Sequence, residues 1–234
     1  MDCLLGIHLR ASVELAAGTA SAAIYHGAVG QIRGTVTGRQ SHAARPNEGV
    51  NAADSLAAIV NAVNAIKPDP TVSASVKVTQ LAAGGDSLNI IPGEGRFGID
   101  LRARTNKVME DLLHQVKRAV VLAGEANGAE VEITEAARMN AAVPHPRMEE
   151  IVSDVIAEVL GPEACQPPPV TPGGEDFHFY STTHDRIAST MIGLGCGLKP
   201  GLHHPNMSFE LSSLPEGVKL IAASTVRLFE NWTA

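Results

Sequence analysis

Three histidines lie where the sequence predicts strand ends and loops, and neutral imidazole is a common ligand for zinc and similar metals. His8 ends a short apolar segment, His42 lies in a polar loop, and His203 lies in a loop bounded by glycine and proline. A single histidine in such a place is more often a hydrogen-bonded structural residue than a ligand. The chain contains no HExxH motif and no CxxC pair, so spacing alone gives a weak indication of a metal site.

Other polar residues are candidates for supporting roles. The neighbouring carboxylates Glu175 and Asp176 follow two glycines; they could orient a ligating imidazole or act as an acid or base, or they could stabilise a helix N-terminus. Arg102 could hold a carboxylate through two parallel hydrogen bonds, but alone it is typical of a solvated strand residue. Asn89 is equally typical of a turn.

The cysteines and the remaining histidines give no further catalytic signal. Cys3, Cys165 and Cys196 have no evident partner for nucleophilic catalysis, and three cysteines do not indicate a disulfide framework. We therefore expect small buried thiols and a reducing compartment. The other histidines are interpreted as structural or surface residues; they are His26, His114, His145, His178, His184 and His204.

The middle of the chain, residues 28–138, predicts a compact α+β unit. Alternating apolar residues indicate strands at 29–37, 73–82, 95–104 and 129–137. Apolar residues at helical spacing indicate helices at 51–66 and 109–126. The order strand, helix, strand, strand, helix, strand is that of the ferredoxin-like arrangement, an antiparallel sheet with two helices on one face.

The flanking segments predict an α/β arrangement. Apolar runs indicate buried strands at 3–9 and 189–194, and helical spacing indicates helices at 148–160 and 215–229. This pattern is typical of the second half of an α/β domain, in which functional loops lie at one edge of a sheet.

Composition excludes several classes of protein. The chain has 234 residues, of which 44% are hydrophobic and 18% charged, with a net charge of −7; it has no block of Lys or Arg, which argues against a nucleic-acid or anionic membrane surface. Aromatic residues make up 3%, too few for base-stacking platforms. No apolar run is long enough to span a membrane, and no export signal is evident at the start. We expect a cytoplasmic protein.

Five stretches, in this order along the chain, resemble the M20 family of metallopeptidases, and they are most similar to its amidohydrolase branch of hippurate, aminoacyl-auxin and aminobenzoyl-glutamate hydrolases. They are residues 6–10 (GIHLR), 38–46 (GRQSHAARP), 89–92 (NIIP), 174–177 (GEDF) and 202–205 (LHHP). Any one stretch alone would be weak, but five in order are specific.

The resemblance implies a partial zinc-exopeptidase-like α/β catalytic domain, residues 1–27 and 139–234, interrupted by a ferredoxin-like dimerisation or lid domain, residues 28–138. It implies a homodimer formed through the inserted domain. It also implies a site for two divalent metal ions, Zn²⁺ or Mn²⁺. His8 and His203 fall on metal-ligand positions, and His42 falls on the lid histidine that polarises the scissile carbonyl. Asn89 and Arg102 fall on lid positions that hold substrate in some relatives.

The implied reaction is hydrolysis of the amide bond of an N-acyl amino acid, or of a related small amide or peptide, by a metal-activated water. The family also carries a Cys-x-His or His-x-Asp ligand pair and a Glu-Glu pair, and neither precedes His8. We therefore expect a chain that begins partway through the catalytic domain, has an incomplete ligand set and binds metal weakly or not at all alone. The alternative is a truncated, catalytically inactive dimerisation module. Neither the metal nor the acyl and amino-acid specificity follows from the sequence.

Overall fold

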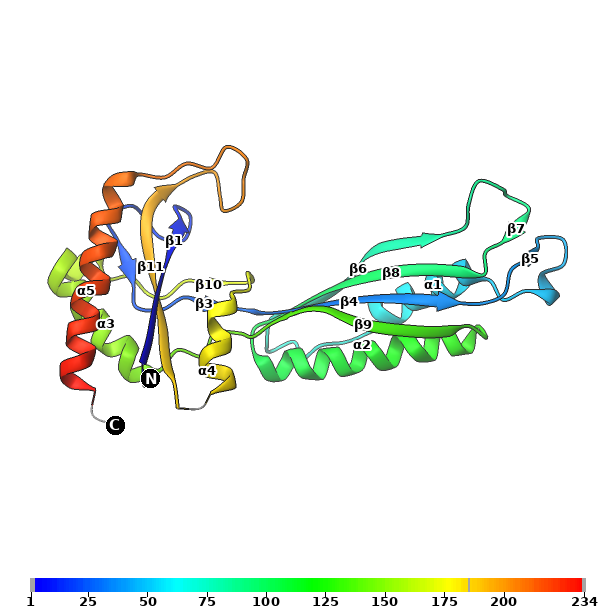
Figure 1. Cartoon of the computed structure of the whole chain (residues 1–234), viewed down its shortest axis with the longest axis horizontal. Coiled ribbons are helices and arrows are strands. Elements are labelled where there is room, and N and C mark those ends of the chain that lie inside the picture. The colour runs from blue at the N-terminus through cyan, green and yellow to red at the C-terminus, as the bar shows by residue number, and fades with distance from the viewer. Residues whose placement is uncertain (1–2, 185, 233–234) are drawn as a thin grey trace. The chain divides into compact units, whose positions relative to one another are not determined.

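A computed structural model describes residues 3–184 and 186–232. The chain divides into two compact units. Unit 1 comprises Met1–His26, Ala142–Thr171 and Glu175–Ala234, and unit 2 comprises Gly27–Ala141 and Pro172–Gly174. Each unit is described by itself below (Figure 1).

Unit 2 is a four-stranded antiparallel sheet covered by two helices. Its strands are β4 (Ala28–Thr37), β6 (Ala74–Ala83), β8 (Glu94–Ala103) and β9 (Glu130–Met139), in the spatial order β6-β8-β4-β9. Helices α1 (Ala52–Asn64) and α2 (Asn106–Ala126) follow the first and third of these strands. Strand order and connections are those of the ferredoxin-like fold.

The side chains of unit 2 explain why these elements pack together. In β4 buried and exposed residues alternate from Gly30 to Thr37, because successive side chains point to opposite faces of a strand. The inward face meets the apolar faces of both helices in one core. Asn51 caps α1 by accepting a hydrogen bond from the N–H of Ala53. Thr105 caps α2 by accepting one from Val108.

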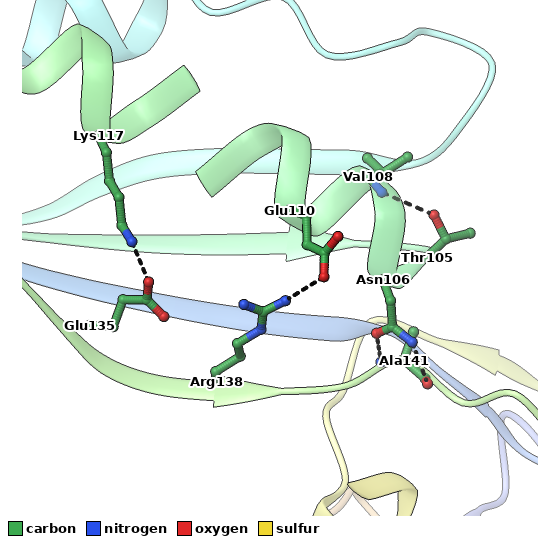
Figure 2. A network of polar contacts seen from close by, with 8 residues as sticks. All are labelled: Thr105, Asn106, Val108, Glu110, Lys117, Glu135, Arg138 and Ala141. Carbon is green, nitrogen blue, oxygen red and sulfur yellow. Dashed lines mark hydrogen bonds and ion pairs between the residues drawn. The ribbon is translucent and has the colours of Figure 1, made fainter. Parts of the chain in front are cut away.

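Polar contacts fix α2 along β9 (Figure 2). The Lys117 side chain pairs with Glu135, and Arg138 pairs with Glu110 at 3.2 Å. At the start of the helix, Asn106 accepts a hydrogen bond from the N–H of Ala141 at 2.6 Å and donates one to its carbonyl at 3.4 Å. The exposed ion pairs contribute little, whereas the Asn106 contacts satisfy main-chain groups where β9 ends.

A short ribbon extends from unit 2. Strand β5 (Ser41–His42) pairs antiparallel with β7 (Ile90–Ile91), and the 3₁₀ helix η1 (Pro46–Glu48) follows β5. Two-residue strands carry too weak a period to be read from sequence. This ribbon matters because two candidate residues of this unit, His42 and Asn89, lie at it.

Unit 1 is built on two parallel strands. Strand β1 (Cys3–Ala11) pairs with β11 (Ala188–Leu198), and β2 (Ala20–Ser21) pairs antiparallel with the other edge of β11. Strand β3 (Tyr25–His26) pairs with β10 (Val170–Thr171). All but one of the residues of β11 are buried, because β11 lies between two strands under helices α3 (Pro146–Leu160) and α5 (Leu214–Asn231).

Short helices complete unit 1. They are η2 (Pro162–Ala164), η3 (Asp176–His178), α4 (Phe179–Thr183) and η4 (Leu211–Ser213). Over the described ranges, no helix has the length and apolar character needed to cross a membrane.

Candidate active site

His8 lies in the second half of β1, and one hydrogen bond defines its ring. Its Nδ1 atom lies 2.6 Å from the carbonyl oxygen of Leu9. Because a carbonyl oxygen only accepts hydrogen bonds, Nδ1 carries a proton, and in the neutral ring Nε2 presents a lone pair. A ring held by a carbonyl at one nitrogen and free at the other is the form in which histidine coordinates a metal.

Glu175 faces that lone pair. Its Oε2 atom lies 3.9 Å from Nε2 of His8, and the two side chains are 21% and 32% exposed. Its other oxygen accepts a hydrogen bond from the N–H of Phe177 at 3.4 Å, which makes Glu175 the N-cap of η3. Two electron-rich atoms that face one another are stable when a proton or a cation lies between them. Glu175 therefore caps η3 and also lies beside His8, and its predicted role in orienting a ligating imidazole or transferring a proton stays a prediction.

A buried histidine pair lies beside His8. Nδ1 of His26 and Nε2 of His178 are 3.0 Å apart, and each residue is 3% exposed. Burial, with smaller contributions from His178, Arg10 and His8, lowers the pKa of His26 from 6.5 to about 3. Burial lowers the pKa of His178 to about 4. Both rings are therefore neutral near pH 7, and one donates to the other.

No functional signal for this pair is visible in the sequence, because the two residues are 152 positions apart. His178 follows the Gly-Glu-Asp-Phe stretch directly and His26 ends β3, but each taken singly is an ordinary buried histidine. Only the fold brings them together.

His203 lies in the loop that follows β11. Its backbone is left-handed, with a φ of 62°, a conformation uncommon for residues other than glycine. Lys199 and Ser208 close the loop through two main-chain hydrogen bonds of 3.0 and 2.9 Å. Next to it, Nδ1 of His204 accepts a hydrogen bond from the N–H of Asn206 at 3.1 Å. The loop thus holds His203 in a defined and strained backbone conformation, which often marks functional positions.

A complete metal site is not formed by the residues that the structure describes: nowhere among them do three or more His, Cys, Asp or Glu side chains gather as possible ligands. The imidazole of His8 and the carboxylate of Glu175 suit a divalent metal in chemistry, but they supply only two donors. Convergence of His8 and His203 on one ion stays a prediction.

Two of the three candidate residues of unit 2, His42 and Asn89, lie at the β5–β7 ribbon. His42 is opposite Ile90, and the N–H of Ala43 donates to the carbonyl of Asn89 at 2.9 Å. Nδ1 of His42 accepts a hydrogen bond from the N–H of Ala44 at 3.0 Å. The proton of the neutral ring is therefore on Nε2, which makes the exposed edge of His42 a hydrogen-bond donor. The structure brings Asn89, which directly precedes β7, beside the end of β5 that carries His42.

Arg102 lies on β8 and already has a carboxylate partner. Its Nε and Nη2 atoms donate to the two oxygens of Asp100 at 2.8 and 3.0 Å. Its Nη1 donates to the carbonyl of Pro172 at 3.5 Å. The two-pronged geometry considered from the sequence is thus formed within the strand itself, and a substrate carboxylate would have to replace Asp100.

The sequence model of peptidase family M20/M25/M40 matches residues 2–226. This chain belongs to that family. The chain is 27% identical over 215 residues to "Uncharacterized hydrolase y4tI" of Sinorhizobium fredii, covering 88% of this chain and 52% of that protein. It is 26% identical over 190 residues to "IAA-amino acid hydrolase ILR1-like 2" of Arabidopsis thaliana, covering 78% of this chain and 43% of that protein. The chain thus spans about half the length of these M20 relatives.

Solved structures share the fold of this M20 chain. A putative aminohydrolase from methicillin-resistant Staphylococcus aureus matches with a TM-score of 0.84 at 19% identity, covering 97% of this chain and 59% of that one. The YXEP protein of Bacillus subtilis, described as a dinuclear metal-binding peptidase of the M20 family, matches with a TM-score of 0.77 at 17% identity, covering 99% and 58%. The recognition of M20 from five short stretches is confirmed, as is a mixed α/β fold like that of M20 peptidases.

Proposed function

We propose that this chain forms part of a metal-dependent hydrolase that cleaves the amide bond of N-acyl amino acids or of related small amides and peptides. Membership of the M20 family supports hydrolysis, and a relative named as an IAA-amino acid hydrolase supports the substrate class. The observation that carries the proposal is the ring of His8, whose Nδ1 meets a carbonyl and whose Nε2 faces Glu175.

In this proposal His8 holds a divalent metal through Nε2, and His203 supplies a second imidazole from its constrained loop. Zn²⁺ and Mn²⁺ both suit this donor chemistry, and a complete site would hold two ions. A bound ion of this kind supplies Lewis acidity for water and carbonyl activation. Glu175 restricts the orientation of the His8 ring. Its carboxylate, which lies next to His8, can also accept a proton.

The candidate residues of unit 2 act on the substrate. His42 donates a hydrogen bond from Nε2 to the scissile carbonyl oxygen, where negative charge develops during the reaction. Asn89, directly before the facing strand β7, provides an amide for binding. Arg102 binds a substrate carboxylate after exchanging its partner Asp100, because one guanidinium fork holds one carboxylate at a time.

We also propose a cytoplasmic homodimer formed through unit 2. Strands β6 and β9 are the two edges of its sheet, and an edge strand presents main-chain groups that can pair with another chain. The last five residues of β6, Thr79–Ala83, are exposed. A partner copy can extend the sheet by pairing one of its own strands with β6 or β9.

The test is release of free amino acid from N-acetyl and N-benzoyl amino acids with added Mn²⁺ or Zn²⁺. It is run on this chain and on the chain extended by any coding sequence that precedes it. We expect metal-dependent turnover that is lost in His8→Ala and strongly reduced in His42→Ala. The matched control is His114→Ala, on the exposed face of α2, which should be neutral. Turnover that is unchanged in His8→Ala would refute the proposal. Absence of turnover in every form would favour an inactive dimerisation module.

A further inference from the structure

The buried His26–His178 pair connects to both groups of the candidate metal site, His8 and Glu175. His26 contacts His8 edge-to-face, with ring centroids 6.2 Å apart and planes at 62°. His178 is the last residue of η3, the short helix whose N-cap is Glu175. One hydrogen bond of 3.0 Å therefore connects the residue that contacts His8 with the helix that carries Glu175.

His8 needs such support because its own hydrogen bond is local. Its Nδ1 binds the carbonyl of the next residue, Leu9, so this bond connects the ring to its own strand and to no other element. The ring of His26 packs against one side of the His8 ring. Phe177 packs edge-to-face on His178 at 5.7 Å, so the second ring of the pair is itself held in place.

Burying two imidazoles at this position is unfavourable unless their polar nitrogens are hydrogen-bonded. Two apolar rings would fill the same space without a polar group to satisfy, whereas each buried imidazole needs a partner. The hydrogen bond between the rings satisfies one nitrogen of each, and it joins β3 to η3 across 152 residues of sequence. A directional hydrogen bond fixes the separation of these two elements more closely than apolar contact does.

We propose that His26 and His178 are positioning residues, which together hold the His8 ring with Nε2 directed at Glu175. This inference deepens the proposed function and rests on it. The pair touches no substrate in this scheme and acts only through His8 and Glu175.

The deciding experiment is a long-range ¹H–¹⁵N NMR spectrum of the histidine rings in the metal-free 234-residue chain at neutral pH. In the unsubstituted protein we expect His8 as a single tautomer with the proton on Nδ1. His178→Phe and His26→Asn should give averaged ring signals for His8. His178→Phe removes the hydrogen bond of the pair but keeps a ring, whereas His26→Asn keeps a hydrogen-bonding group but removes the ring. His178→Gln, which places an amide near the position of Nε2, should restore the single tautomer.

Zn²⁺ titration by calorimetry provides the second readout. Loss of an outer partner of a ligating histidine weakens metal binding by roughly 10–100-fold, so we expect this loss in His178→Phe and recovery in His178→Gln. His184→Ala, an exposed site in the same unit, is the control. The emission of Trp232 reports whether each variant is folded.

The outcomes separate the two proposals. If His8→Ala leaves Zn²⁺ binding unchanged, the proposed function fails, while the tautomer spectra still decide whether the pair positions His8. If His8 remains a single Nδ1–H tautomer in folded His26→Asn and His178→Phe, the positioning role is refuted.

Discussion

Acidification should destabilise unit 1 through the His26–His178 pair. Their folded-state pKa values, about 3 and about 4, lie below the ordinary value of 6.5. Each therefore binds fewer protons when folded than when unfolded, and protons favour the unfolded state. The stability that depends on their neutrality is complete above about pH 6.5 and is lost as the pH falls toward the folded values.

The magnitude follows from the same shifts. When the pH falls from about 7 to about 5.5, each histidine should lower the free energy of unfolding of unit 1 by about 1.2 kcal/mol, and the pair by about 2.5 kcal/mol. The carboxylates with lowered pKa values, Asp69 and Glu135, both lie in unit 2 and titrate at lower pH. They do not disturb this comparison.

The single tryptophan of the chain makes the assay selective. Trp232 lies in unit 1, where its ring packs on His145 at 5.2 Å. Urea unfolding followed by the emission maximum of Trp232 therefore reports on unit 1. The control is His26→Asn combined with His178→Gln, which keeps hydrogen-bonding groups but removes both titrating rings. Its loss of stability over the same pH range should be smaller by about 2.5 kcal/mol. Equal pH dependence in the two proteins would show that the rings are not neutral and buried as described.

Three further predictions concern unit 2. Gly34→Ala should destabilise it by about 2–3 kcal/mol, because a Cβ atom there would lie 2.1 Å from Cζ of Phe97. The control is Gly85→Ala, where nothing lies within 4 Å of the added Cβ atom and stability should change by less than about 1 kcal/mol. Thermal unfolding of both variants tests this. Asn106→Ala should cost about 1–2 kcal/mol through its lost main-chain hydrogen bonds, and an unchanged urea midpoint would contradict this. His42→Ala should lower kcat by about 10²–10³-fold if its Nε2 proton stabilises the developing oxyanion; an effect on KM alone would assign it to binding instead.

Much of the secondary structure followed from periodicity. The strand expected at residues 29–37 is β4, and the helix expected at 109–126 is α2, which begins slightly earlier at its Thr105 cap. Long amphipathic elements are predictable because their burial repeats over several turns or strand residues. The two-residue strands of the β5–β7 ribbon were not predicted, since two residues carry no period.

The candidate site was predictable only in part. His8 and Glu175 were selected from local context, and the fold places them 3.9 Å apart. The tautomers of His8 and His42 could not be predicted, because each depends on a main-chain atom whose position the fold determines. The His26–His178 pair was missed for the same reason, as its two members come together only when β3 and η3 are in place.

The account depends most on His8 acting as a metal ligand through Nε2. Anomalous X-ray scattering from crystals of the protein exposed to Zn²⁺ tests this directly. We predict a zinc peak about 2.0–2.1 Å from Nε2 of His8, with His203 among its ligands and Nδ1 of His8 still on the carbonyl of Leu9. A zinc ion bound elsewhere on the protein, with His8 free of metal, would contradict the account.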